Sequence, residues 1–334
     1  MILPIVGISA LQFWLNGMIT SITDQYAFDR RKLTALPEDY GFRPSEEMVR
    51  LLSERFGLTF PVCLRAPSAS KRISSGYICS SVRRQGIPER SFIRLDSGFG
   101  ISDGGSGQCQ IYVACPELCF LSAAVKNTLY QQIRLGYDLC AIYAENPSSQ
   151  YGQHSRQPLT SVGNIRDYLD NVTGFNGLRR SQAAAKYILD RSNSAKETQV
   201  AMYSILPFHL GGYALKTPSL NAFAALSPEG CRLTGHQSLM CDLIWPEDKV
   251  IAEYDSNLTH LSADQHRTDK SRATALALSG YQLFSITADN LRSFDRLEAT
   301  FSALRKMLNM RSRDPELNKY RKKRLELFSF FHTW

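Results

Sequence analysis

The segment from Met240 to His260, MCDLIWPEDKVIAEYDSNLTH, carries three carboxylates outside its central turn, Asp242, Glu253 and Asp255, and one imidazole, His260. Cys241–Trp245 and Val250–Asp255 are runs of strand-forming residues, and the Pro-Glu-Asp-Lys sequence between them is typical of a turn. The pattern predicts a hairpin that brings side chains capable of acid, base or metal chemistry onto two neighbouring strands.

The register of this hairpin decides where the acids lie. If Trp245 pairs with Val250 across the turn, Asp242 lies opposite Glu253, and Asp255 follows on the same face. Two carboxylates about 5 Å apart repel each other by roughly 3 kcal/mol at an effective dielectric of about 20. A divalent cation such as Mg²⁺ reverses the sign of this energy because it prefers hard oxygen ligands. The alternative is a hairpin face exposed to water, where the acids are only solvated; the apolar neighbours favour a buried sheet.

This hairpin resembles the active-site hairpin of the PD-(D/E)XK nuclease superfamily, in particular that of very short patch repair endonucleases and related bacterial endonuclease-domain proteins. The family carries an acid on one strand and acid–x–acid or acid–x–lysine on the next, a pattern that Asp242, Glu253 and Asp255 match. His260 falls where the repair endonucleases carry a site histidine. The sequence departs from the family in two places: Asp255 stands where classical members carry lysine, and Ser256 where relatives often carry glycine.

The resemblance implies a metal-dependent DNA endonuclease that hydrolyses phosphodiester bonds. Asp242 and Glu253 would hold Mg²⁺ (or Mn²⁺) together with the backbone carbonyl of Tyr254, and the ion would activate a water molecule. Asp255 or His260 would orient that water, His260 acting as a general base. The alternative for His260 is an ordinary loop histidine. No G-x-S-x-G motif is present, which disfavours a serine hydrolase.

Four further residues join these candidates. The family places a glutamate early in the helix before the hairpin, where this chain has Glu197; the sequence Ser194-Ala-Lys-Glu197 is also a capping box, which would by itself explain the residue. Because the usual lysine is absent, Lys249, Lys270 or Arg272 must neutralise the charge that develops on the phosphate and contact the DNA. The partner implied is therefore DNA.

The elements around the hairpin predict an α/β fold with a restriction-endonuclease-like mixed sheet flanked by helices. Helices are expected after Ser194, over 262–280 and from Asn290 to about Leu308, with a strand over 281–287. The 262–280 helix connects two strands that we expect to be parallel. The resemblance covers roughly residues 190–308, and residues 211–235 are expected to be rich in loops.

Domain boundaries follow changes in composition. We expect an α+β N-terminal domain over 1–158, bridging helices over 159–190, the nuclease-like domain over 191–310 and a basic, aromatic tail over 311–334. Residues 1–58 are expected to be mostly helical, with Ser9 as a helix N-cap, and residues 59–113 to contain short strands. Their basic residues, which fit either a phosphate-binding sheet face or protected sheet edges, are Arg65, Lys71, Arg72, Arg83, Arg84, Arg90 and Arg94.

The composition is that of an ordinary globular protein, with 43% hydrophobic and 21% charged residues, and the net charge of +8 permits a polyanionic partner. The eight cysteines form no C-x-x-C pairs, which argues against zinc and for a reducing compartment. No segment approaches the roughly 20 apolar residues that span a bilayer. We therefore expect a cytoplasmic protein.

Two functions other than catalysis remain open. The helices and basic β-region before the nuclease-like domain are typical of a regulatory module, so the protein is alternatively a catalytically inactive DNA-binding regulator, or an antitoxin-like protein, that retains the nuclease fold. A purely structural scaffold is the third alternative, and it would show no salt-dependent nucleic-acid binding.

Overall fold

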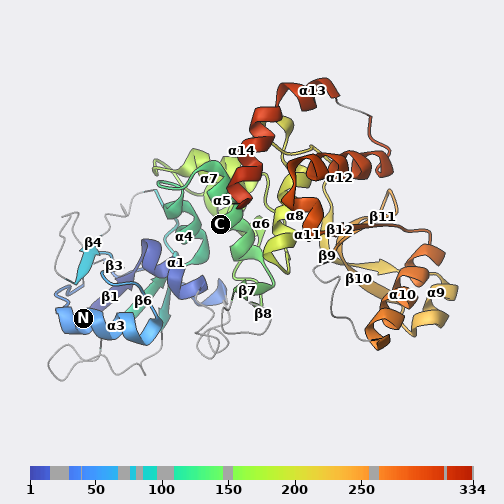
Figure 1. Cartoon of the computed structure of the whole chain (residues 1–334). Helices are drawn as coiled ribbons and strands as arrows, with labels where there is room; N and C mark the ends of the chain where they lie inside the picture. Colours follow the sequence, from blue (N-terminus) through green and yellow to red (C-terminus); the bar gives the residue numbers. More distant parts are fainter. Residues whose placement is uncertain are drawn as a thin grey trace. The chain divides into compact units, whose positions relative to one another are not determined.

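The computed structural model describes residues 1–15, 30–38, 40–66, 76–79, 86–95, 109–145, 153–255, 263–311 and 314–332, except the side chains of residues 79, 263–269 and 314–315. The chain divides into two compact units, Met1–Ile188 and Leu189–Trp334 (Figure 1). Helices α6 (Val162–Asp170) and α7 (Leu178–Ala185), which the sequence suggested as a bridge, belong to the first unit. No helix in the described ranges is long and apolar enough to cross a membrane.

The first unit is built on a mixed sheet with the strand order β2-β5-β6-β1-β3-β4. β1 runs parallel to β6 and β3 runs parallel to β4, while the other neighbours are antiparallel. The strands are β1 (Ile2–Ile5), β2 (Leu33–Thr34), β3 (Val62–Leu64), β4 (Tyr77–Cys79), β5 (Phe92–Leu95) and β6 (Gln110–Ala114). The α+β character predicted for this part of the chain is confirmed.

Three helices of the first unit begin at residues that favour a helix start. The Ser45 side chain accepts a hydrogen bond from the Met48 N–H at 3.3 Å, and Gly57 ends α3 (Glu46–Phe56) with a φ of 59°. Pro116 occupies the first turn of α4 (Pro116–Ala123), and Thr128 caps α5 (Leu129–Cys140). The unit also contains α1 (Gly7–Leu15), a 3-10 turn η2 (Arg30–Lys32) and the hairpin β7 (Tyr143–Glu145) with β8 (Gln153–Ser155).

Two details of the first unit differ from the expectations. In the described part of residues 1–58, where mostly helix is expected, Ile2–Ile5 forms a buried strand of the sheet. Ser9 is not an N-cap; it lies inside α1, where its buried hydroxyl oxygen accepts a hydrogen bond from the Cys63 N–H at 2.9 Å. Among the basic residues of the β-region, Arg65 is buried, Arg90 and Arg94 are exposed, and the other four lie outside the described residues.

The second unit contains a four-stranded mixed sheet with the order β12-β11-β10-β9. β10 is antiparallel to both of its neighbours, and β11 is parallel to β12. The strands are β9 (Ser219–Ala225), β10 (Ser238–Trp245), β11 (Val250–Asp255) and β12 (Gln282–Thr287). The parallel pair is joined through α10 (Ala263–Leu278), as the sequence predicts. The mixed sheet is thus confirmed, and its likeness to restriction endonucleases stays a prediction.

Residues 211–235 do not form only loops, since they contain β9 and the helix α9 (Pro228–Thr234). Ser227 caps α9 by accepting the Gly230 N–H at 3.2 Å, and its own N–H donates to the hydroxyl of Ser279 at 2.8 Å. A Cβ at Gly230 would lie 2.9 Å from the Ala275 carbonyl oxygen, so glycine allows α9 to approach α10 closely.

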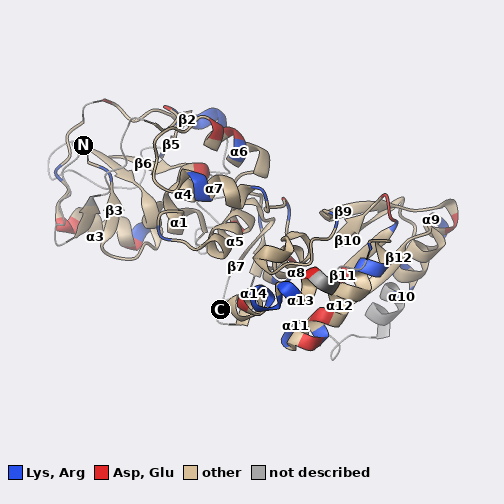
Figure 2. Cartoon of the chain, turned by 90° about the horizontal axis from the view of Figure 1, so that it is seen from above, with Lys and Arg blue, Asp and Glu red and all other residues tan. Residues whose placement is uncertain are grey.

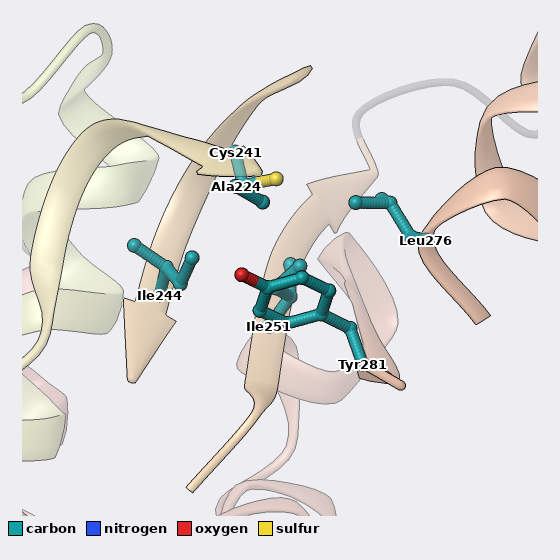
Figure 3. Packing of buried hydrophobic residues seen from close by; sticks show 6 residues of the cluster. All are labelled: Ala224, Cys241, Ile244, Ile251, Leu276 and Tyr281. Atoms are coloured by element: carbon teal, nitrogen blue, oxygen red, sulfur yellow. The ribbon is translucent and has the colours of Figure 1, made fainter. Parts of the chain in front are cut away.

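The second sheet and α10 bury an apolar cluster between them. Figure 3 shows its side chains turned toward one another from β9, β10, β11, α10 and the residue before β12. The cluster consists of Ala224, Cys241, Ile244, Ile251, Leu276 and Tyr281, with Ala222, Leu226 and Leu239 packed against it. This core fixes the sheet relative to α10.

The C-terminal segment is helical and in part buried. It follows α11 (Ala288–Arg292) and α12 (Phe294–Met307) and comprises α13 (Asp314–Lys319) and α14 (Arg321–His332). Lys and Arg gather at the start of α14, whereas α11 carries one acidic and one basic residue, Asp289 and Arg292 (Figure 2). Arg324 is buried and its Nε donates to Glu298 at 2.7 Å, and the Phe331 ring lies 5.2 Å from that of Tyr203. The segment is therefore not simply a free basic tail.

Candidate active site

The β10–β11 hairpin has the predicted register. Trp245 pairs with Val250, and the ladder continues through Ile244 and Ile251 to Leu243 and Ala252. Beyond that pair, a side chain makes the hydrogen bond between the two strands: the Oδ2 atom of Asp242 accepts a hydrogen bond from the Tyr254 N–H at 2.9 Å. The carboxylate of Asp242 is thereby fixed at the end of the ladder, next to the strand that carries Glu253.

Glu197 reaches this place from the first turn of α8 (Ala195–Ile205). Half of the predicted capping box forms, because the Ser194 hydroxyl accepts the Glu197 N–H at 3.1 Å. The Glu197 carboxylate accepts instead from the Asn193 N–H at 2.9 Å, one residue before the cap. Glu197 is buried, with 6% of its surface exposed, so its carboxylate belongs to the interior of the unit and not to a solvated helix end.

Asn221 on β9 connects Glu197 to the sheet, and sequence reasoning missed it. Its side-chain amide donates to the Glu197 Oε2 atom at 2.6 Å and to the Arg191 carbonyl oxygen at 2.9 Å. Its φ is 44°, in the left-handed region that asparagine tolerates better than most residues. An asparagine among the mostly apolar residues Leu220–Ala225 was the signal in the sequence, but its partner could not be read from spacing.

Arg272 from α10 neutralises Glu253. Its Nη2 atom donates to the Glu253 Oε1 atom at 2.7 Å, and both side chains are about one-third exposed or less, at 28% and 35%. The same guanidinium donates to the Met240 carbonyl oxygen and lies 3.8 Å from the Cys241 Sγ atom. Of the three cations named from the sequence, Arg272 is therefore the one that lies beside the acids.

The electrostatics of the cluster single out Asp242. Burial, followed by repulsion from Glu197, raises its pKa to about 7; repulsion from Glu253 adds to the effect, while the Tyr254 N–H and Arg272 oppose it. Burial also raises the pKa of Glu197, against its hydrogen bonds from Asn193, Asn221 and Ser194. Asp242 is therefore half protonated near neutral pH, which is a property of groups that exchange protons during catalysis.

The nearby thiol is not a nucleophile. Burial, together with repulsion from Glu253, raises the pKa of Cys241 to about 12, so it is a thiol at neutral pH. Burial opposes the charge on Arg272, but its hydrogen bond and attraction to Glu253 raise its pKa above the ordinary value. The cluster thus contains three carboxyl groups and one permanent cation.

The remaining candidates are placed less centrally. Asp255 is half-buried at the end of β11, opposite Thr287 of β12, and Tyr254 is opposite Ile286. Lys249 lies at the turn, four residues before Glu253 in the chain, with its Nζ 4.4 Å from the centre of the Tyr281 ring. Lys270 is exposed on α10. His260 lies outside the described residues.

The acids provide oxygen ligands of the kind that Mg²⁺ prefers. The Tyr254 N–H donates to the Oδ2 atom of Asp242 and Arg272 donates to the Oε1 atom of Glu253, whose carboxylate also interacts with the Cys241 thiol. Within the described ranges, however, no three His, Cys, Asp or Glu residues are grouped so as to hold a metal ion. The carboxylate oxygens are suitable ligands for a hard cation. Glu253 would then interact with both the cation and Arg272.

Comparisons with protein-family models, with curated proteins and with solved structures find no match to this chain.

Proposed function

We propose that the second unit is a metal-dependent DNA endonuclease domain. The observation that carries the proposal is the convergence of Glu197, Asp242 and Glu253, from a helix and two strands, at one end of a mixed sheet. Glu197 and Glu253 both raise the pKa of Asp242, so the three carboxyl groups share one electrostatic environment. Such a concentration of acids is unfavourable in a structural role and favourable around a divalent cation.

Each residue then has a role in phosphodiester hydrolysis, in which a water oxygen bonds to phosphorus and a phosphorus–oxygen bond of the backbone breaks. Asp242 and Glu253 would hold the cation, with the Tyr254 carbonyl as a further oxygen ligand. When bound, Mg²⁺ supplies charge neutralisation on the phosphate and lowers the pKa of a water molecule. Asp255 or His260 would orient the attacking water.

Arg272 takes the role that lysine has in the family. Its guanidinium has several donors and bonds to Glu253 through only part of them, so it can also donate to a phosphate oxygen. In that position it stabilises the negative charge that develops on the phosphate in the transition state. Glu197 supports the site by keeping Asn221 and the start of α8 beside Asp242.

The test is cleavage of supercoiled and linear DNA by the purified full chain with Mg²⁺ or Mn²⁺. We expect wild type to cleave and both Asp242→Asn and Glu253→Gln to lose cleavage by at least about a hundredfold, the scale of losing a metal ligand or its outer support. Glu247→Gln is the matched control, because Glu247 is an exposed acid in the turn of the same hairpin. Loss of cleavage in the control, or none in the two site variants, would contradict the proposal.

One observation favours the second candidate, an inactive DNA-binding regulator that retains this fold. Glu253 already has a cationic partner in Arg272, and Asp255 stands where a catalytic lysine is expected. A regulator should bind DNA without cleaving it, and Asp242→Asn should leave its DNA affinity unchanged. Absence of cleavage by wild type, together with salt-dependent DNA binding, would replace the first proposal by this one.

A further inference from the structure

Two apolar side chains are exposed beside the acids. Phe223 on β9 has 66% of its surface exposed and Met240 on β10 has 40%, and the two residues are paired directly across the strands. Their sequence neighbours Ala222, Ala224, Leu239 and Cys241 all pack in or against the core cluster under α10. Because side chains alternate along a strand, Phe223 and Met240 point to the opposite face of the sheet. We call this pair the apolar platform.

The apolar platform lies next to the proposed catalytic residues. Asn221, which binds Glu197, is two residues before Phe223 on β9, and Asp242 is two residues after Met240 on β10. A step of two residues along a strand is about 7 Å, so the platform begins roughly that far from the carboxyl cluster. The platform and the carboxyl cluster are therefore close enough to contact neighbouring groups of one extended molecule.

Positive charge borders the same place. Arg191 and Lys196 are exposed at the start of α8, on either side of the cap of that helix, and the Arg191 carbonyl accepts the amide of Asn221. On the other strand, the guanidinium of Arg272 bonds to the Met240 carbonyl oxygen. An exposed ring with cations on neighbouring elements fits a ligand that carries both phosphates and flat π surfaces.

We infer that the apolar platform stacks on an unpaired base of single-stranded DNA whose backbone passes the carboxyl cluster. The inference rests on the proposed function and names its substrate class. In a duplex the faces of the bases are covered by their neighbours, so an exposed phenylalanine on a strand has nothing to stack on. In a single strand every base presents a face, and one base–aromatic stack is a substantial part of the binding energy.

The first measurement is DNA binding by the full chain in chelator, which prevents cleavage. A labelled single-stranded oligonucleotide and the matching duplex are titrated and followed by fluorescence anisotropy. Phe223→Ala should weaken single-strand binding about tenfold, which lies within the range for loss of one stacked base. Duplex affinity should stay unchanged, and Phe223→Trp should retain the wild-type single-strand affinity. Leu233→Ala is the control, since Leu233 is an exposed apolar residue on α9 of the same unit.

The possible results separate this inference from the proposed function. An equal loss for single strand and duplex, or no loss in Phe223→Ala, would overturn the stacking role even if wild type cleaves DNA with Mg²⁺. A selective tenfold loss would support it even if wild type fails to cleave, in which case only the endonuclease proposal falls. If Phe223→Ala changes the oligomeric state in light scattering and leaves DNA affinity unchanged, the platform contacts a second copy of the chain, and the inference is wrong.

Discussion

The two ends of the β10–β11 hairpin differ in nearly every physical respect. At the turn end, Trp245 and Val250 are buried and paired through the backbone, and the Trp245 Nε1 atom donates to the Lys216 carbonyl at 2.8 Å. At the open end, the Asp242 carboxylate takes the Tyr254 N–H and faces two other acids. The same two strands thus carry an ordinary apolar core at one end and, at the other, acids whose mutual repulsion destabilises the fold.

The difference shows how the fold can retain the acids. Fully burying one large apolar side chain contributes about 1.5–3 kcal/mol, and the turn end buries Ile244, Trp245 and Ile251. The burial of these side chains therefore offsets a carboxyl cluster that destabilises the open end of the same hairpin by a few kcal/mol. Changes at the open end should consequently alter pH dependence and cation response, whereas changes at the turn end should alter only stability.

The largest effect is expected for Asp242→Asn. The folded pKa of about 7 lies above the ordinary value of 3.8, so the folded state binds this proton more tightly than the unfolded state. The contribution of protonated Asp242 to the free energy of unfolding is fully present below about pH 4 and is lost as the pH rises to about 7. The total loss is at most about 4 kcal/mol. At pH 8, Asp242→Asn should therefore be more stable than wild type by about 2–4 kcal/mol, while at pH 4 the two should be equal.

Denaturant titrations of both proteins at pH 4 and pH 8 measure this prediction. Addition of Mg²⁺ at pH 8 should stabilise wild type and leave Asp242→Asn unchanged, because ligand binding to the folded state raises its stability. An equal response of both proteins to Mg²⁺ would mean that the cation binds elsewhere. A stability difference that does not vary with pH would contradict the raised pKa.

A smaller effect is expected for Arg272→Gln, which leaves Glu253 without its cation. At pH 8 in chelator the variant should lose about 1–3 kcal/mol, the cost of leaving a partly buried charged group without its hydrogen bond. Because Arg272 lowers the pKa of Asp242, its removal should raise that pKa further, and the loss of stability with rising pH should extend to a higher pH. Lys270→Gln, an exposed neighbour on α10, is the control and should change the unfolding free energy by less than about 0.5 kcal/mol.

Asn221→Gly separates the backbone role of this residue from its hydrogen bonds. Glycine adopts a φ of 44° without strain, so the variant loses only the bonds to Glu197 and Arg191. We expect a loss of about 1–2 kcal/mol in unfolding free energy, the value of two net hydrogen bonds. Asn221→Asp should be less stable than Asn221→Gly at pH 8, since it adds a carboxylate beside Glu197. Equal stability of the two variants would argue against that electrostatic cost.

The smallest effect is expected at the turn end. Lys249 has a φ of 54° and its Nζ lies over the Tyr281 ring, so Lys249→Asn keeps the backbone conformation and removes the cation–π contact. We expect a loss of at most about 1 kcal/mol and no change in the Mg²⁺ response. A changed Mg²⁺ response in this variant would place Lys249 in the site and weaken the contrast between the two ends.

Local rules were enough to predict the hairpin, because its turn chemistry and two apolar runs fix the register without help from the rest of the chain. They failed for β9, whose small and polar residues have low strand propensity and which forms by pairing with β10. They also failed for β1, since a short apolar run has no periodicity that distinguishes a strand from a helix. In the site, Asp242 and Glu253 could be found from spacing.

The other parts of the site depend on contacts between distant segments. Asn221 meets Glu197 across 24 positions of the chain, and Arg272 meets Glu253 across 19. Neither separation corresponds to a repeat of a helix or a strand, so only the packing of α8 and α10 around the sheet brings these residues together. The half-formed capping box has the same origin, because Asn221 competes for the Glu197 carboxylate.

The conformation of Asn221 also limits which sequences can evolve into this site. Its backbone favours glycine, asparagine or aspartate, and its amide must donate to a carboxylate, a condition that glycine and ionised aspartate do not meet. Of these three residues, only asparagine satisfies both conditions. Descendants of a common ancestor could therefore diverge through most of the sheet and still be recognised by an asparagine on the strand paired with the Asp242 strand, bonded to a glutamate in the first turn of the preceding helix.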